Sequence, residues 1–203
     1  TPMADVEVIS LGQDFLNKLN ILDKITLKIN SLGDFDSRKN YRNSLVNYLM
    51  DYQSKLSKDS LRRLSINPLR ILDSKNEEDQ KIIQNAPSML EYLNIDSKTR
   101  FEDVCKGLDY LNIKYQIDKK PVRGLDYYCH TAFEFITNEL GTQGTVLAGG
   151  RYDGLSKMLG GPDVPGVGWA AGIERLALMV QSEFVNAIDV VLVGQCEKFN
   201  YLL

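Results

Sequence analysis

The sequence is poor in the two side chains that most often bind metals and transfer protons. It holds one histidine, His130, which excludes mechanisms that need two imidazoles and histidine-rich metal sites within this chain. Its three cysteines, Cys105, Cys129 and Cys196, lie far apart without paired spacing, so they form neither a disulfide framework nor a zinc site on their own. We expect reduced cysteines, and any chemistry to be done by carboxylate, arginine and tyrosine side chains.

Long apolar runs and an excess of basic residues are also missing. No run approaches the roughly 20 apolar residues that cross a bilayer, and the chain does not start with a charged-then-apolar secretory signal. We therefore expect no membrane contact and a cytoplasmic location. The net charge of −3 argues against a general nucleic-acid-binding domain, so any such contact must be local. At 203 residues, of which 43% are hydrophobic, the chain can build one large domain or a core with an inserted module.

Glycine is concentrated in one stretch together with arginine, at residues 121–175. Ten of the fifteen glycines fall between positions 141 and 172, where glycine serves backbone geometry or the approach of a ligand. Three strings stand out: RGLDYY at 123–128, GGRYDGL at 149–155 and GVGWAAGIERL at 166–176. Each contains an arginine, whose planar fork donates two parallel hydrogen bonds to phosphate. Glycine beside fixed cations predicts a nucleotide pocket.

Periodicity along the chain predicts an α+β fold, in which helices flank an antiparallel β-sheet. Residues 23–33 alternate apolar and polar side chains, which is typical of a strand with one wet face. Further strands with short connections and then a helix over 171–181 indicate an antiparallel meander. These strands are expected at 113–120, 130–138, 145–149 and 165–170. A first helix over 1–21 is expected to bury Val8, Leu11, Phe15, Leu16 and Leu19.

Between residues 34 and 112 strand signals vanish, which predicts a small inserted helical domain. Its first helix is expected to be capped by Asp36 or Ser37, and its last by Asp96 or Ser97. Shorter helices are expected at 60–66 and 76–84, with a helical turn around Met89. The apolar stripes are Tyr41, Leu45, Leu49, Tyr52 and Leu56 on the first helix, and Phe101, Val104, Leu108 and Leu111 on the last.

The charge of this helical segment favours a packed module with a solvated surface. Its 13 basic and 13 acidic residues cancel. Arg62, Arg63 and Arg70 form a cluster able to touch a phosphate backbone, but such clusters are common on protein surfaces.

Two arginines are candidates for binding phosphate. Arg123 either forms an ion pair within its loop or grips a phosphate at a reacting bond, where a fixed cation stabilises the developing charge. Arg175 lies in the first turns of a helix, where the helix dipole and the arginine together hold an anion, unless Glu174 is its partner.

Aromatic and glycine neighbours raise further alternatives. Tyr127 and Tyr128 are adjacent, so without a bulge only one of them enters a given pocket. The pair Gly149–Gly150 marks either a β-bulge or tight bend, or bare backbone against which a planar ligand such as adenine lies. Cys129 and His130 receive little weight, because the histidine has no second ligand and the thiol has no partner base in the sequence.

The three strings, in this order and spacing, resemble the two histidine-specific signatures and motif 3 of histidyl-tRNA synthetase, a class II aminoacyl-tRNA synthetase. The resemblance extends to NSLG at 30–33, NYR at 40–42 and NPLRILDSK at 67–75. It implies that ATP, with Mg²⁺, activates histidine to histidyl-adenylate, and that the aminoacyl group then passes to the 3′ end of tRNA. It also implies a homodimer of the full-length protein.

The resemblance implies roles for particular residues. Arg123 is the expected catalytic residue, placed at the α-phosphate of ATP and the histidine carboxylate. Tyr127, Tyr128 and Tyr152 are expected at the histidine, while Gly168 and Arg175 are expected at ATP, the latter at its far phosphates. No protein-held metal is expected, and Cys129 and His130 carry no expected role.

The resemblance also divides the chain. Residues 1–33 and 113–183 correspond to the catalytic domain, and 34–112 to the insertion domain, which approaches the tRNA acceptor arm. Residues 187–203 correspond to the start of an anticodon-binding domain. Motifs 1 and 2 are not found in the sequence, so we expect a fragment that forms no adenylate by itself. The alternative is a non-catalytic synthetase-like regulatory subunit or domain that binds histidine or nucleotide, but Arg123 and the helical insertion favour the enzyme.

Overall fold

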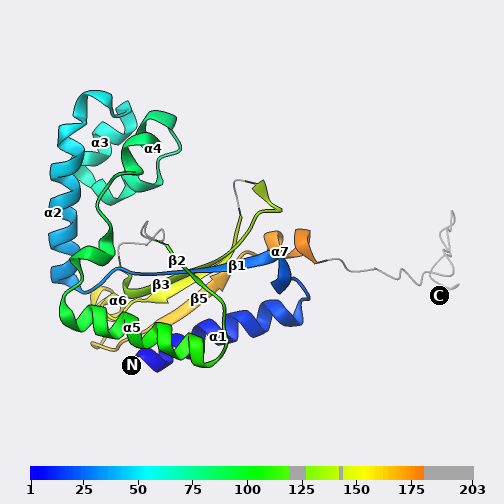
Figure 1. The fold of residues 1–203 in the computed structure, drawn as a ribbon. Coiled ribbons are helices and arrows are strands. Elements are labelled where there is room, and N and C mark those ends of the chain that lie inside the picture. Colours follow the sequence, from blue (N-terminus) through cyan, green and yellow to red (C-terminus); the bar gives the residue numbers. More distant parts are fainter. Residues whose placement is uncertain (119–126, 142–143, 181–203) are drawn as a thin grey trace, which may run out of the picture.

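The computed structural model describes residues 1–118, 127–141 and 144–180, in which one sheet carries helices on one face and a helical module at one end (Figure 1). The strand order is β2-β1-β3-β4-β5. Pairs β1–β3, β3–β4 and β4–β5 are antiparallel, which confirms the predicted α+β fold with a largely antiparallel sheet. The strands are β1 (Ile25–Ser31), β2 (Gln116–Ile117), β3 (Cys129–Thr137), β4 (Thr145–Arg151) and β5 (Val167–Ala171).

The edge strand β2 differs from the prediction of a strand over 113–120 within the meander. Only two residues form β2, and they pair in parallel with β1. Strand β1 takes the place beside β3 because all seven of its residues pair with that strand, from Ile25 opposite Thr137 to Ser31 opposite Thr131. Residues 113–118 therefore reach only the outer edge of the sheet.

Two long helices lie along one face of the sheet, α1 (Pro2–Lys18) and α5 (Ile95–Tyr110) (Figure 1). The predicted first helix is confirmed, but its buried face is wrong in part, because Leu11 is 59% exposed whereas Val6 and Ile9 are buried. The buried face of α1 includes Gly12, and a Cβ there would lie 3.2 Å from the Phe135 ring. The helix thus approaches the strands most closely through a residue without a side chain.

The first hydrophobic core lies between these two helices and the sheet. Val6 and Ile9 of α1 pack there with Phe133 and Phe135 of β3 and with Val104 of α5. Leu108 of α5 is also buried as predicted, whereas the predicted Leu111 is exposed. Short helices complete this part of the fold: η1 (Leu22–Lys24), α6 (Leu155–Met158) and α7 (Ile173–Met179).

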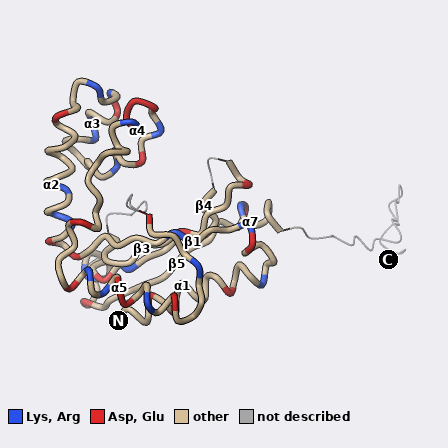
Figure 2. The backbone as a smooth tube through the Cα atoms, in the orientation of Figure 1, with Lys and Arg blue, Asp and Glu red and all other residues tan. Residues whose placement is uncertain are grey.

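A second core holds the helical module together. Tyr41, Leu45 and Leu49 form its buried stripe on the first helix, as predicted. Basic and acidic residues are interspersed over this module (Figure 2). Its elements are α2 (Phe35–Asp51), η2 (Gln53–Lys55), α3 (Lys58–Ile66), η3 (Pro68–Asp73), α4 (Glu77–Ile83) and η4 (Met89–Tyr92). The predicted domain limits at residues 34 and 112 stay a prediction, although α5 shares its core with the sheet.

The predicted N-caps of α2 and α5 are wrong by two or three residues. Asp34 caps α2 by accepting a hydrogen bond from Ser37 N at 2.9 Å, and Asn94 caps α5 by accepting one from Ser97 N at 2.9 Å. An N-cap side chain binds the amide about three residues ahead, so each serine supplies the donor instead. Asn94 Nδ2 also donates to Asp34 Oδ2 at 2.6 Å, which joins the starts of the two helices.

No helix among the described residues is both long and apolar enough to cross a membrane.

A fully buried carboxylate, Asp79, organises the helical module. Its Oδ1 accepts a hydrogen bond from Ser57 N at 2.8 Å, and its Oδ2 accepts from the hydroxyls of Ser57, Ser60 and Ser74 at 2.6–2.7 Å. Burial alone would raise the pKa of Asp79, but these hydrogen bonds outweigh it and lower the pKa below its ordinary value of 3.8. The ionised carboxylate therefore stabilises the folded module.

We expect Asp79→Asn to lower the free energy of unfolding by about 1–3 kcal/mol at neutral pH, because an amide leaves hydroxyl donors unpaired. Since folding depresses the pKa of Asp79, its contribution is present above 3.8 and is lost as pH falls from there through the lower folded value. Urea unfolding followed by circular dichroism at both ends of this range measures the effect.

Asp59→Asn is the matched control, because Asp59 is an exposed carboxylate that pairs with Arg62 and Arg63 on α3. It should cost less than about 1 kcal/mol. If both variants lost the same free energy of unfolding at both pH values, ionised Asp79 would not be the group that stabilises the module.

Candidate active site

The centre of the site is a buried arginine, Arg151, at the end of β4. It is 3% exposed. Its Nε donates to Asp5 Oδ1 at 2.9 Å, its Nη1 donates to Asp153 Oδ1 at 2.8 Å, and its Nη2 also contacts Asp5 Oδ1. Burial lowers the pKa of Arg151, but the two carboxylates outweigh this and raise it above its ordinary value. The Arg151 guanidinium therefore binds carboxylates inside the protein. The sequence suggested instead that the arginine of this string binds a phosphate.

Asp5 carries the network into three more elements. It is fully buried on α1, and its Oδ2 accepts a hydrogen bond from Thr131 Oγ1 of β3 at 2.7 Å. Arg100 of α5 lies with its Nη2 3.5 Å from the same oxygen. The Asp5 carboxylate thus links α1 and α5 to β3 in the middle of the sheet.

Asp153 ties the turn after β4 to the segment before β5. Its Oδ1 accepts a hydrogen bond from Gly166 N at 3.2 Å, and Tyr152 N donates to Gly166 O at 2.8 Å. A Cβ on Gly168 would lie 2.8 Å from Tyr152 Oη, and a Cβ on Gly166 would overlap the ring. Glycine at these two positions therefore leaves room for the Tyr152 side chain.

The structure brings together the three tyrosines that the sequence assigns to the site. The ring centroids are 5.0 Å apart for Tyr127 and Tyr128, 6.2 Å for Tyr127 and Tyr152, and 6.3 Å for Tyr128 and Tyr152. Tyr127 and Tyr128 lie before β3 begins, so the rule that neighbouring side chains of a regular strand point to opposite faces does not apply to them. Burial, followed by the neighbouring Tyr127, raises the pKa of Tyr128. We refer to Tyr127, Tyr128 and Tyr152 as the tyrosine cluster.

The pair Gly149–Gly150 forms no tight bend and offers no bare backbone for adenine, but the predicted β-bulge does occur opposite Gly150. Both residues pair within β4, and a Cβ on Gly150 would lie 2.8 Å from Thr131 O. A Cβ on Gly149 would overlap Gly168 O of the neighbouring strand. Protein atoms occupy the space at both glycines, and the register shift nearby belongs to β3, between Cys129 and Ala132.

Arg175 is not brought to the tyrosine cluster. Arg175 of α7 donates through Nη1 to Thr145 O at 2.5 Å, at the start of β4. The cluster adjoins Arg151 at the other end of this strand, six residues away, or roughly 20 Å at about 3.3 Å per residue. Arg123 lies outside the described residues, as does the stretch 187–203.

Sequence reasoning missed a basic cavity beside the tyrosine cluster. This cavity of about 520 Å³ is lined by Tyr127 and Cys129 on one side and by Arg38, Lys39 and Arg42 of α2 on the other. Arg38 Nη1 donates to Tyr128 O at 2.7 Å, which holds α2 to the cluster. The spacing of three and four residues among these cations and the exposed Phe35 is the signal for a shared helix face.

Cys129 and His130, which received little weight, also lie in this region. Ligand atoms of Cys129, His130 and Asp153 all fall within 4.8 Å of one another. No sequence pattern predicts this group, because Asp153 is more than twenty residues away and a regular strand would separate the side chains of Cys129 and His130.

Comparisons with known proteins agree with the motifs. A family model described as histidyl-tRNA synthetase matches residues 1–176. The histidine–tRNA ligase of Rhodospirillum rubrum is 53% identical over 186 residues, which make up 92% of this chain and 45% of that protein. The chain spans about half the length of the curated relatives it matches.

Solved structures give the same result. The apo histidyl-tRNA synthetase of S. aureus matches with a TM-score of 0.70 and 36% identity, over 90% of this chain and 44% of that one. An ATP phosphoribosyltransferase regulatory subunit/histidyl-tRNA synthetase from Bacillus halodurans matches with a TM-score of 0.54 over 90% of this chain and 51% of that one. At 19% identity, the second match shows the fold alone.

We expect Arg151→Gln to lower the free energy of unfolding by about 3–5 kcal/mol, because it leaves the buried charge of Asp5 without its main partner. Urea unfolding at neutral pH measures the loss. Arg62→Gln is the control, since Arg62 pairs with Asp59 at 3.1 Å while 75% of its side chain is exposed. That change should cost less than about 1 kcal/mol. Losses of similar size would show that the Arg151 network does not stabilise the fold.

Proposed function

Because this chain belongs to the histidyl-tRNA synthetase family, we propose that it supplies part of the catalytic domain of a histidine–tRNA ligase. In the first step a carboxylate oxygen of histidine attacks the α-phosphorus of ATP, and the bond from that phosphorus to the leaving pyrophosphate breaks. In the second step a ribose hydroxyl at the 3′ end of tRNA attacks the carbonyl carbon of histidyl-adenylate, and AMP leaves. Mg²⁺ accompanies ATP as its counter-ion.

The observation that carries this proposal is the tyrosine cluster. Three phenol rings within 6.3 Å of one another offer aromatic surface and hydroxyl groups to a small aromatic ligand. The imidazole of histidine is such a ligand. Tyr127, Tyr128 and Tyr152 are therefore proposed to contact the histidine, with Arg123 at its carboxylate.

The phosphates of ATP are proposed to lie along the sheet, toward Arg175. This arginine spends one donor on Thr145 O, and a guanidinium has five, so others remain for the far phosphates. Gly168 lies on β5, opposite Gly150, and is proposed to face the substrates between the two ends of the sheet. Arg123, outside the described residues, is proposed to bind the α-phosphate and to stabilise its transition state.

The helical module is proposed to approach the acceptor arm of tRNA. Its overall charge is balanced, so the contact must be local, and the basic face of α2 at Arg38, Lys39 and Arg42 is the support for it. A homodimer of the longer protein is proposed from the family resemblance alone, and a cytoplasmic location is proposed from the sequence pattern. Retention of Arg123 and of the helical module favours the ligase over a regulatory paralogue.

We expect Arg123→Ala, in the longer protein that carries this chain, to slow adenylate formation by about 10²–10³-fold, because a fixed cation at the reacting phosphate stabilises charge that develops only in the transition state. ATP affinity should change much less. Histidine-dependent exchange of pyrophosphate into ATP measures the first quantity, and equilibrium dialysis measures the second.

Arg62→Ala is the control, because this exposed arginine of α3 should leave both quantities unchanged in an assay without tRNA. Equal losses of exchange rate and ATP affinity in Arg123→Ala would show that Arg123 binds the ground state. No loss at all would remove Arg123 from the site.

A further inference from the structure

A bulge at the start of β3 gives two adjacent side chains an unusual arrangement. Cys129 pairs with Arg151 and Ala132 pairs with Gly150, so two residues of β3 lie between consecutive partners on β4. One of them, His130, has a backbone φ of 48°, which few non-glycine residues adopt. Bulges of this kind redirect a side chain from its regular side of the strand.

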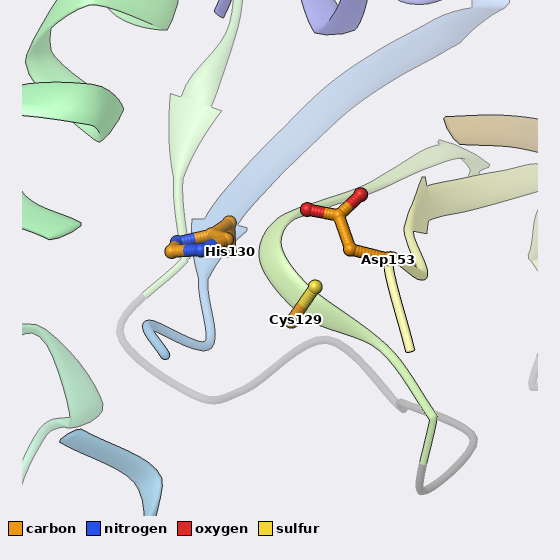
Figure 3. A group of neighbouring side chains, drawn as sticks. All are labelled: Cys129, His130 and Asp153. Atoms are coloured by element: carbon orange, nitrogen blue, oxygen red, sulfur yellow. The ribbon is translucent and has the colours of Figure 1, made fainter. Parts of the chain in front are cut away.

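The surrounding backbone holds His130 in this conformation. Its N–H donates to Gly33 O at 2.8 Å, and its carbonyl accepts from Leu32 N at 2.7 Å. A strained residue fixed by two such hydrogen bonds is a feature that proteins retain at functional positions. The consequence is that Cys129 and His130, which a regular strand would point to opposite faces, lie together with Asp153 (Figure 3).

The three side chains form a set of possible metal ligands. The sulfur of Cys129, a ring nitrogen of His130 and a carboxylate oxygen of Asp153 all lie within 4.8 Å of one another. His130 Nδ1 is buried and has no hydrogen-bond partner among the described residues. An unpaired buried nitrogen is costly, and binding a metal is one way in which an imidazole nitrogen is satisfied.

We propose that Cys129, His130 and Asp153 bind one Zn²⁺ ion or a similar borderline-soft divalent cation. Thiolate, imidazole and carboxylate are the ligand types of zinc sites, and three protein ligands leave a fourth position open. Cys129 also lines the basic cavity, so the fourth position is accessible to water or to a ligand from that side. This site goes beyond the proposed ligase reaction and does not depend on it.

Three arginines act on the ligands, Arg151 on all three, Arg100 on His130 and Arg38 on Cys129. Asp153 uses Oδ1 for Arg151 and Gly166, so the proposal assigns its Oδ2 to the metal and leaves the Arg151 contact as an outer hydrogen bond. Asp5 contacts both Arg151 and Arg100, so its single negative charge balances one of these two arginines. With a thiolate and a carboxylate as ligands, the two charges of the ion are also balanced.

Metal binding at this site is coupled to a proton, because the Cys129 sulfur coordinates as a thiolate and the His130 imidazole coordinates in its neutral form. When the metal–sulfur bond forms, the thiol proton passes to solvent.

A metal here would connect the two segments that carry the tyrosine cluster. Cys129 directly follows Tyr127 and Tyr128, and Asp153 directly follows Tyr152. The ion would therefore act as a clamp across the start of β3 and the end of β4. Its expected effect is to fix the three rings relative to one another.

Cobalt titration tests the proposal, because Co²⁺ replaces Zn²⁺ in such sites and shows a thiolate-to-metal charge-transfer band. The full chain carrying Cys105→Ser and Cys196→Ser should bind one equivalent of Co²⁺ with this band, since only Cys129 remains. Adding Cys129→Ser should abolish the band. His130→Asn should weaken Co²⁺ binding by at least about tenfold; asparagine is chosen because it tolerates a positive φ.

A second measurement needs no variant at the site. Zn²⁺ alone should protect Cys129 of the unmodified chain from alkylation by iodoacetamide, as read by mass spectrometry of its peptide, while Cys105 of α5 reacts at an unchanged rate. Absence of the cobalt band, survival of the band in Cys129→Ser, or equal alkylation of Cys129 with and without Zn²⁺ would each overturn the proposal.

Discussion

The buried guanidinium of Arg151 is the constraint on which the rest of the site depends. A charge removed from water must be paired, and here Asp5 comes from α1 while Asp153 comes from the turn after β4. The first pair holds the helix against the sheet, and the second sets the path of the chain on either side of Tyr152. Because Tyr152 lies between Arg151 and Asp153, its ring is directed over Gly166 and Gly168. One electrostatic requirement thus positions the side chain that completes the tyrosine cluster.

The local pattern of apolar and polar residues was enough to predict most helices and strands. It did not predict which strands pair or which distant side chains contact one another. The strand in residues 23–33 was confirmed, although its polar residue Asn30 is buried instead of exposed. The apolar stripe of Tyr41, Leu45 and Leu49 was confirmed because it reflects burial of one helix face. The parallel edge strand was missed because it depends on β1 occupying the place beside β3, a non-local competition for pairing. The burial of Arg151 was missed for the same kind of reason, since its partner Asp5 is 146 residues away.

The candidate site was predicted in its composition more than in its geometry. The strings named the three tyrosines, and the structure places their rings together. The glycine pair 149–150 indicated a bulge, but the residues did not indicate that it lies in β3 at His130 and gathers Cys129 and Asp153. Glycines 149 and 150 suggested room for a ligand, but that room is filled by the neighbouring strands. Family membership rests on the comparisons, whereas the roles of Arg123 and Arg175 remain proposals.

The central claim is that the buried network supports a tyrosine cluster that binds histidine. The most direct test is calorimetric titration of L-histidine into the protein carrying Tyr152→Leu, which leaves Asp5, Arg151 and Asp153 in place. The account predicts that histidine affinity falls by at least about tenfold, the loss of about 1.4 kcal/mol expected for one aromatic contact with its hydroxyl, while the unfolding midpoint stays near that of the unaltered protein. Unchanged histidine affinity in a folded Tyr152→Leu protein would contradict it.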